Sequence, residues 1–117
     1  YYRADKIENL DTNINKIIID KLDGWCDDPS QKEYNQLIRF PFEFSAEKLF
    51  RDDSLYNVVC VLNYNTNPVI HGIGSAIFMH VAHDEYNPTE GCVALKQEDL
   101  IYLLSFVDDK TEVILGD

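Results

Sequence analysis

The chain has 117 residues, the size of one domain with its own hydrophobic core. Hydrophobic residues make up 45% of the sequence, which excludes an intrinsically disordered chain. The 21 acidic residues outnumber the 10 basic ones and give a net charge of −11, which argues against nucleic acid or an anionic membrane surface as a partner.

The sequence contains no apolar run long enough to span a bilayer and no signal-peptide pattern. It begins at Tyr1 without an initiator methionine, so we expect it to start inside a longer protein. Cys26, Cys60 and Cys92 are an odd number of cysteines, so at least one thiol lies outside any disulfide.

The first third of the chain predicts mostly loop. Residues 1–15 are polar, and the β-branched run at 16–19 predicts a strand. Residues 24–35 are rich in Asp, Pro, Ser and Asn without any period. They predict an ordered loop that is anchored by Trp25 and Tyr34.

The middle of the chain predicts one short helix and two strands. Ser45 is a good N-cap, so we expect a short helix over residues 46–50. The continuous apolar run 56–62 predicts a strand that is buried on both faces. Residues 75–81 predict another strand, with His80 close to its end.

The last part of the chain predicts the main helix. Apolar residues recur at helical spacing between positions 97 and 107, and Glu98 and Asp99 suit the positive end of a helix dipole. Residues 111–115 alternate and predict a closing strand. The elements therefore predict a single, mainly β domain over residues 1–117 with one substantial helix.

Two residues near the predicted helix carry candidate chemistry. Cys92 follows His80 by twelve positions and stands directly behind Gly91. A cysteine is a good nucleophile only as the thiolate, and a neighbouring histidine is the usual means of forming it. The pattern predicts Cys92 as nucleophile and His80 as general base, with buried core side chains as the alternative interpretation of both.

These residues stand in motifs that resemble the L,D-transpeptidase (YkuD-type) catalytic domain. The segments that carry the resemblance are Gly74-Ser75-Ala76-Ile77-Phe78-Met79-His80, Thr89-Glu90-Gly91-Cys92-Val93, Asp99-Leu100, Gly24-Trp25-Cys26-Asp27-Asp28-Pro29, Tyr34-Asn35, Ser45-Ala46-Glu47 and Leu55-Tyr56. The resemblance implies a mixed β-sandwich with one substantial helix after the catalytic cysteine. In the family, further strands precede this segment, so we expect an N-terminally truncated domain.

The family remodels bacterial peptidoglycan. The resemblance therefore implies a cysteine-dependent L,D-transpeptidase that acts in cell wall biogenesis and cell shape, in the cell envelope or periplasm, without a cofactor. The implied partner is a peptidoglycan stem tetrapeptide, which acylates Cys92 before transfer to an amine acceptor. Two alternatives remain: an L,D-carboxypeptidase that uses water as the acceptor, and a non-catalytic cell-wall binding module.

The resemblance also implies how the two catalytic residues are supported. Backbone N–H groups of Gly91 and Cys92 would form the oxyanion hole. A backbone carbonyl, not an acid, would hold the second ring nitrogen of His80. Thr89 matches a Ser/Thr position that either braces the loop or touches the substrate.

Two positions depart from the family pattern. Ala94 stands where many members have arginine or asparagine, and Glu90 stands where histidine is frequent. Arg39 and Arg51 are the candidate replacements for the missing cation, and a different substrate is the other explanation.

A second candidate site lies around the motif that contains Trp25. It is either a substrate wall, with Asp27 or Asp28 meeting the ammonium group of a diaminopimelate side chain, or a loop pinned by Asx turns and a buried tryptophan. The residues assigned to the substrate wall are Trp25, Asp27, Asp28, Tyr34, Asn35 and Arg39.

Zinc is the competing interpretation of the histidine motif. His80, His83, Cys92 and Cys26 could supply four ligands. Structural zinc sites usually present tight Cys-x-x-Cys pairs, and this sequence has none. We therefore predict no metal in the site.

Overall fold

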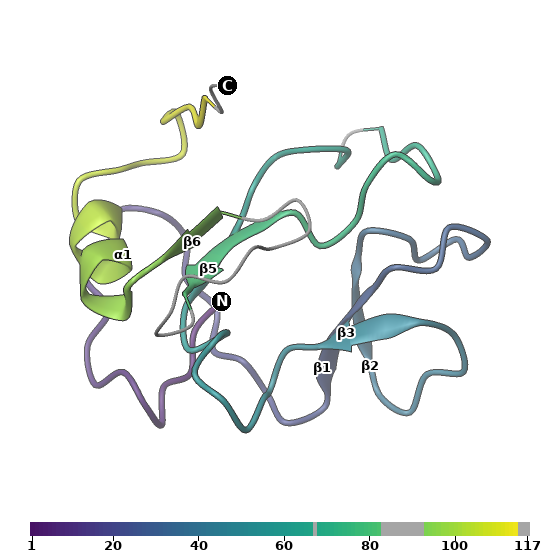
Figure 1. Cartoon of the computed structure of the whole chain (residues 1–117), viewed down its shortest axis with the longest axis horizontal. Helices are drawn as coiled ribbons and strands as arrows, with labels where there is room; N and C mark the ends of the chain where they lie inside the picture. The colour runs from purple at the N-terminus through teal and green to yellow at the C-terminus, as the bar shows by residue number, and fades with distance from the viewer. Residues whose placement is uncertain (67, 83–92, 115–117) are drawn as a thin grey trace.

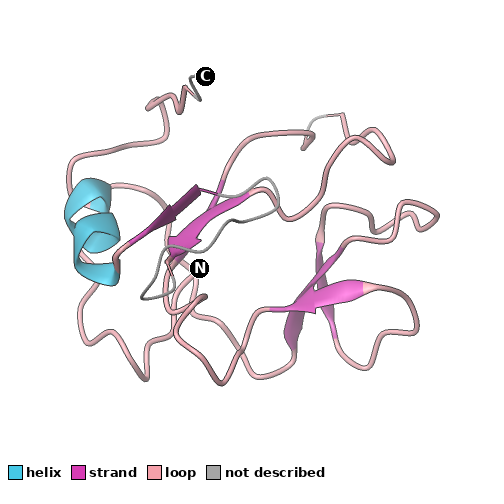
Figure 2. Ribbon diagram, viewed as in Figure 1, coloured by secondary structure: helices cyan, strands magenta, loops and turns pink. Residues whose placement is uncertain are grey.

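The computed structural model describes residues 1–66, 68–82 and 93–114 (Figures 1 and 2). The first sheet consists of three short strands, β1 (Asp23–Cys26), β2 (Leu37–Arg39) and β3 (Ala46–Lys48). β1 is the central strand and pairs antiparallel with both neighbours. It is buried along its whole length, so this sheet is organised around the segment that contains Trp25.

The second sheet is mixed and carries His80. Its strands are β4 (Val59–Val61), β5 (Phe78–Val81) and β6 (Val93–Leu95), with β5 in the centre. β5 runs antiparallel to β4 and parallel to β6. Helix α1 (Gln97–Leu104) follows β6 directly and packs against β5 (Figure 1).

All four residues of β5 are buried, because both faces of this strand are covered. Side chains alternate between the two faces of a strand. Met79 and Val81 belong to one hydrophobic cluster together with Leu100 and Leu104 of α1. Phe78 belongs to a second cluster that includes Trp25 of β1. The second sheet is therefore enclosed between the helix and the first sheet.

Helix α1 is placed by Leu100 and Leu104, which are four residues apart on one face and are both buried. Its first turn carries Glu98 and Asp99, and no basic residue occupies its last turn. The predicted helix extends to residue 107, but α1 ends at Leu104. Two aspartates follow soon after this end, where negative charge opposes the helix dipole.

Two predictions for the first half of the chain are wrong. Residues 46–48 form β3 instead of the start of a helix, because pairing with β1 outweighs the propensity of a segment too short to be a stable helix. The predicted loop 24–35 contains most of β1, because Gly24 and Trp25 lie between two pairing strands.

Other boundaries differ from the prediction. Within residues 16–19, Ile18 forms an isolated bridge with Tyr2. Residues 111–114 are exposed and not in a strand, and position 115 lies outside the described residues. These segments lack the continuous partner strand that a ladder requires.

The prediction of a mainly β domain with one substantial helix is confirmed. The parallel pairing of β5 with β6 makes the second sheet mixed, as the resemblance implies. Among the described residues, no helix has the length and apolar character needed to cross a membrane.

We predict that Gly24→Ala destabilises the protein. A Cβ atom at this position would lie 2.6 Å from Cε2 of Phe40 and 2.8 Å from Cδ1 of Ile38, so both side chains must move. Overpacking of this kind costs about 1–3 kcal/mol, which urea unfolding can measure.

The double variant Gly24→Ala/Phe40→Leu tests the cause. If steric overlap with the ring produces the loss, the double variant loses less stability than the sum of the two single variants. Strictly additive losses would contradict this explanation.

Candidate active site around His80

His80 lies on the central strand β5 and is 4% exposed. Its Nδ1 atom is 2.8 Å from the backbone oxygen of Val81. A carbonyl oxygen can only accept, so this contact is a hydrogen bond when Nδ1 carries the proton. In the neutral ring, Nε2 then carries the lone pair, which is the state that a general base requires. A backbone carbonyl at this nitrogen is the arrangement that the resemblance implies.

A chain of aromatic rings connects His80 to the first sheet. The ring of Tyr56 meets the His80 ring edge-on at a centroid distance of 5.6 Å. Tyr56 also meets Phe78 at 5.8 Å, and Phe78 meets Trp25 at 5.4 Å, both nearly perpendicular. Edge-to-face contacts of this kind are favourable beyond simple burial. His80 is therefore packed into the core and does not stand on a flexible loop.

The position that departs from the family pattern lies directly beside His80. Ala94 on β6 is the register partner of His80 on β5. Of the two candidate replacement cations, Arg51 has its guanidinium carbon 5.3 Å from the centroid of the Tyr56 ring. Arg39 forms its ion pairs elsewhere, with aspartates at the start of the first sheet. The geometry therefore favours Arg51 over Arg39 as the cation nearer to His80.

Several residues of the predicted site cannot be placed. Thr89, Gly91 and Cys92 lie outside the described residues, as do Glu90 and the His83 of the zinc alternative. The described chain resumes at Val93, directly after Cys92 in sequence, so the nucleophile and the oxyanion hole stay predictions.

Trp25 and Asn35 of the second candidate site form one buried hydrogen-bond network. The Trp25 Nε1–H donates to Asn35 Oδ1 at 3.0 Å, and the Ala76 N–H donates to the same oxygen at 3.2 Å. The Asn35 amide nitrogen donates to the carbonyls of Tyr64 and Asn65 at 3.2 and 2.6 Å. Asn35 thus joins the first sheet to the two segments that precede β5.

Other members of this second group also make local contacts. Asp27 accepts a hydrogen bond from the Ser45 hydroxyl at 2.6 Å, and Asp28 accepts one from the Ser30 hydroxyl at the same distance. The hydrogen bonds from Ser30 lower the pKa of the Asp28 carboxyl. Tyr34 is buried and stacks on a histidine ring. These contacts account for the order of the loop, and the substrate role of the group stays a prediction.

Arg39 lies on β2 and pairs with two carboxylates. Its guanidinium is 3.0 Å from Asp20 and 3.4 Å from the buried Asp23. The backbone N–H of Leu22, followed by the Arg39 charge, lowers the pKa of the Asp20 carboxyl. The structure therefore separates Arg39 from the Trp25–Asn35 network, although the sequence analysis grouped them.

The two described cysteines are poor nucleophiles. Cys26 is fully buried in β1, and burial followed by the nearby Asp27 and Asp28 charges raises the pKa of its thiol, against a hydrogen bond to the Asp28 backbone. Burial likewise raises the pKa of the Cys60 thiol. A higher pKa leaves less thiolate at neutral pH.

Within the part of the chain that the structure describes, no group of three or more His, Cys, Asp and Glu side chains could hold a metal ion. The zinc alternative stays untested, because it depends on His83 and Cys92.

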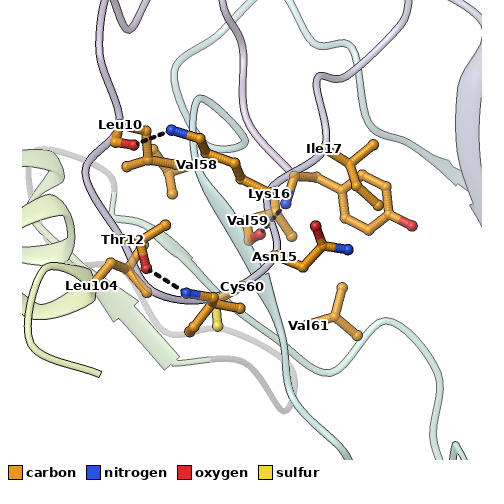
Figure 3. A pocket seen from close by; sticks show the side chains of 12 residues that line it. Leu10, Thr12, Asn15, Lys16, Ile17, Val58, Val59, Cys60, Val61 and Leu104 are labelled. Atoms are coloured by element: carbon orange, nitrogen blue, oxygen red, sulfur yellow. Dashed lines mark hydrogen bonds between the residues drawn. The ribbon is translucent and has the colours of Figure 1, made fainter. Parts of the chain in front are cut away.

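A cavity of about 210 Å³ lies at the outer edge of β4 (Figure 3). Apolar side chains of the segment 10–17, of β4 and of the end of α1 line it, and His80 is not among its described lining residues. Lys16 reaches across one side and donates to the Leu10 carbonyl at 2.7 Å. Cys60 lines this cavity, and burial raises the pKa of its thiol, which leaves less thiolate at neutral pH.

Tyr56, beside the candidate base, and Glu47, which contacts Tyr56, have no role in the predictions from sequence. Tyr56 contacts His80, and its hydroxyl donates to a Glu47 carboxylate oxygen at 2.8 Å. Both residues stand in motifs that carry the family resemblance, which was the available signal. The contact of Tyr56 with His80 depends on the segment before β4 lying against β5, where the Val81 N–H donates to the Leu55 carbonyl at 3.0 Å, and no local pattern encodes that.

We predict that Asn35→Gly lowers stability by about 1–3 kcal/mol, because it leaves the buried Trp25 N–H without its acceptor. Glycine is the suitable replacement because Asn35 has a positive φ of 58°. Urea unfolding measures the loss, and KM for a stem tetrapeptide is the second measurement. A raised KM with unchanged stability would contradict the structural interpretation and favour the substrate wall.

The comparison with protein families agrees with this architecture. The family model of the L,D-transpeptidase catalytic domain (YkuD) matches residues 2–115, which is nearly the whole chain. Searches of curated proteins and of solved structures gave no significant match. The chain therefore belongs to the YkuD family of L,D-transpeptidase catalytic domains.

Proposed function

We propose that the chain is a peptidoglycan L,D-transpeptidase in which Cys92 is the nucleophile and His80 is the general base and acid. Family membership supports the substrate class and a location in the bacterial cell envelope. The remaining support comes from the described neighbours of the two residues.

The pairing of β5 with β6 is the observation that carries this proposal. Val93 is the register partner of Met79, and Ala94 is the partner of His80. Cys92 is covalently bonded to Val93, the residue directly before the register partner of His80. This register supports a Cys92 thiol within reach of the His80 ring.

The proposed reaction has two acyl-transfer steps. The His80 Nε2 atom accepts the thiol proton, and the Cys92 sulfur attacks the carbonyl that joins the third and fourth residues of the stem peptide. The C–N bond breaks, a C–S thioester forms, and the proton passes to the departing D-amino acid. An acceptor amine then attacks the thioester, so that an amide forms and the thiol is restored.

Backbone donors complete the proposed site. The N–H groups of Gly91 and Cys92 would stabilise the negative oxygen of each tetrahedral intermediate. Thr89 would brace this loop or touch the substrate.

The first test is the mass of the intact protein after incubation with a stem tetrapeptide. We expect an acyl adduct on Cys92 that adds the mass of the tripeptide less one water, and we expect Cys92→Ser to abolish it, because a serine hydroxyl is a weak nucleophile at its ordinary pKa. Product analysis with an added amine separates a transpeptidase from a carboxypeptidase, which would release the free tripeptide.

Cys60→Ala is the matched control. It should keep the adduct and lose about 1 kcal/mol of stability, because the Cys60 side chain is only partly buried. An adduct that persists in Cys92→Ser would overturn the assignment of the nucleophile. A complete lack of adduct in the wild type would favour the binding module.

The second test compares histidine variants. We expect His80→Gln to slow acylation by about 10²–10⁴-fold, the usual contribution of a general acid–base group. His71→Gln should have little effect, because His71 is exposed and its Nδ1 lies 2.7 Å from the Pro29 carbonyl. The measurement is the acylation rate between pH 6 and 9.

High pH should partly rescue His80→Gln, because a cysteine with a free pKa of about 8.5 ionises without help there. The variant His83→Gln distinguishes the zinc alternative from the cysteine mechanism. Equal damage from His80→Gln and His83→Gln, together with zinc bound to the purified wild type, would favour a metal site over the cysteine mechanism.

A further inference from the structure

His80 is held on one side by a neighbouring ring that the proposed mechanism does not use. Tyr56 is 6% exposed, and its ring meets the His80 ring at 5.6 Å with an interplanar angle of 75°. The bond from Nδ1 to the Val81 carbonyl fixes one edge of the imidazole. The Tyr56 ring fills the space beside the imidazole, so the imidazole could not rotate into another orientation without colliding with it.

Tyr56 is itself held from two directions. Its ring packs against Phe78 at 5.8 Å, and its hydroxyl donates to the Glu47 carboxylate at 2.8 Å. Phe78 and His80 are two residues apart on β5 and share a face, so one tyrosine ring spans both. Glu47 belongs to β3, so the hydrogen bond connects the first sheet to the ring that packs against His80.

A hydrogen bond to a charged acceptor is stronger than one between neutral groups, so Glu47 is a firm anchor for the Tyr56 ring. Arg51 lies on the same ring at 5.3 Å, and its guanidinium also binds Asp53 through two hydrogen bonds of 2.8 and 2.6 Å. The ring beside His80 is therefore fixed by a carboxylate and packed by a guanidinium.

We propose that Tyr56, anchored by Glu47, is a positioning residue that holds the His80 ring in the orientation needed for proton transfer. This inference rests on the proposed role of His80. Small errors in the placement of a catalytic group lower the rate strongly, because the reacting atoms must lie in a narrow range of geometries.

The test uses the full chain and a stem tetrapeptide as substrate. Tyr56→Leu removes the ring, and we expect kcat to fall by about 10²-fold with KM little changed. Tyr56→Phe keeps the ring against Phe78 and His80 and loses the anchor, so its kcat should lie between those of the leucine variant and the wild type. Glu47→Gln keeps an acceptor for the hydroxyl and should lose less activity than Glu47→Ala.

The second measurement follows the His80 ring directly. Long-range ¹H–¹⁵N spectra distinguish a ring protonated at Nδ1 from one protonated at Nε2. We expect the wild type to hold the proton at Nδ1 and Tyr56→Leu to show a mixture of the two forms. A merely structural role for Tyr56 would leave the ring signals of the folded protein unchanged.

Phe50→Leu is the matched control for lost packing. Phe50 is a partly buried aromatic residue that packs against the hydrophobic cluster of Tyr56 and Phe78, and its ring contacts Arg3 instead of His80. Its variant should lose stability without any change in kcat or in the His80 signals. If Tyr56→Leu does not fold, Tyr56→Phe and the two Glu47 variants carry the same comparison.

The outcomes separate the two proposals. An inactive His80→Gln together with Tyr56 and Glu47 variants that keep the wild-type kcat and the wild-type ring signals would overturn the positioning role alone. A fully active His80→Gln would overturn the proposed function and, with it, the role of Tyr56.

Discussion

The ring of Phe78, fully buried between the two sheets, is the contact on which the candidate site depends. Trp25 of β1 meets it at 5.4 Å and Tyr56 at 5.8 Å, so it joins the first sheet to the second. Alternation along β5 ties the direction of His80 to the direction of Phe78, because the two side chains share a face. The orientation of the candidate base is therefore a consequence of core packing.

This dependence matters because the secondary structure is sparse. The strands are three or four residues long, and sheets of this size have little stability alone. The first sheet is joined to the segment before β5 by Asn35, which accepts two hydrogen bonds and donates two. Ring contacts and the buried side-chain amide of Asn35 therefore stabilise this domain, a role that long hydrogen-bond ladders have in larger sheets. The order of the segment around His80 comes from these long-range contacts.

Sequence patterns identified the mainly β class, the strand with His80 and the start of α1, because alternation and helical spacing are local signals. They missed β1, β2, β3 and β6, whose residues form strands only by pairing with other segments of the chain. The candidate base was visible from the motif, and its carbonyl partner followed from the resemblance. The residues that were predicted to form one site around Trp25 do not all lie together, because Arg39 forms ion pairs with Asp20 and Asp23 instead. The contact of Tyr56 with His80 could not be read from any spacing, because it requires the segment before β4 to lie against β5.

The hydrogen bond from His80 to the Val81 carbonyl has a consequence for sequence variation. A base that is oriented by an aspartate side chain loses its orienting group through a single substitution. Every amino acid at position 81 supplies a main-chain carbonyl, so no replacement there deletes the acceptor. The side chain at position 81 can then change to suit its packing in the cluster with α1. The backbone carbonyl still determines which ring nitrogen of His80 carries the proton. The tautomer of the His80 ring and the packing of the side chain at position 81 can thus evolve independently.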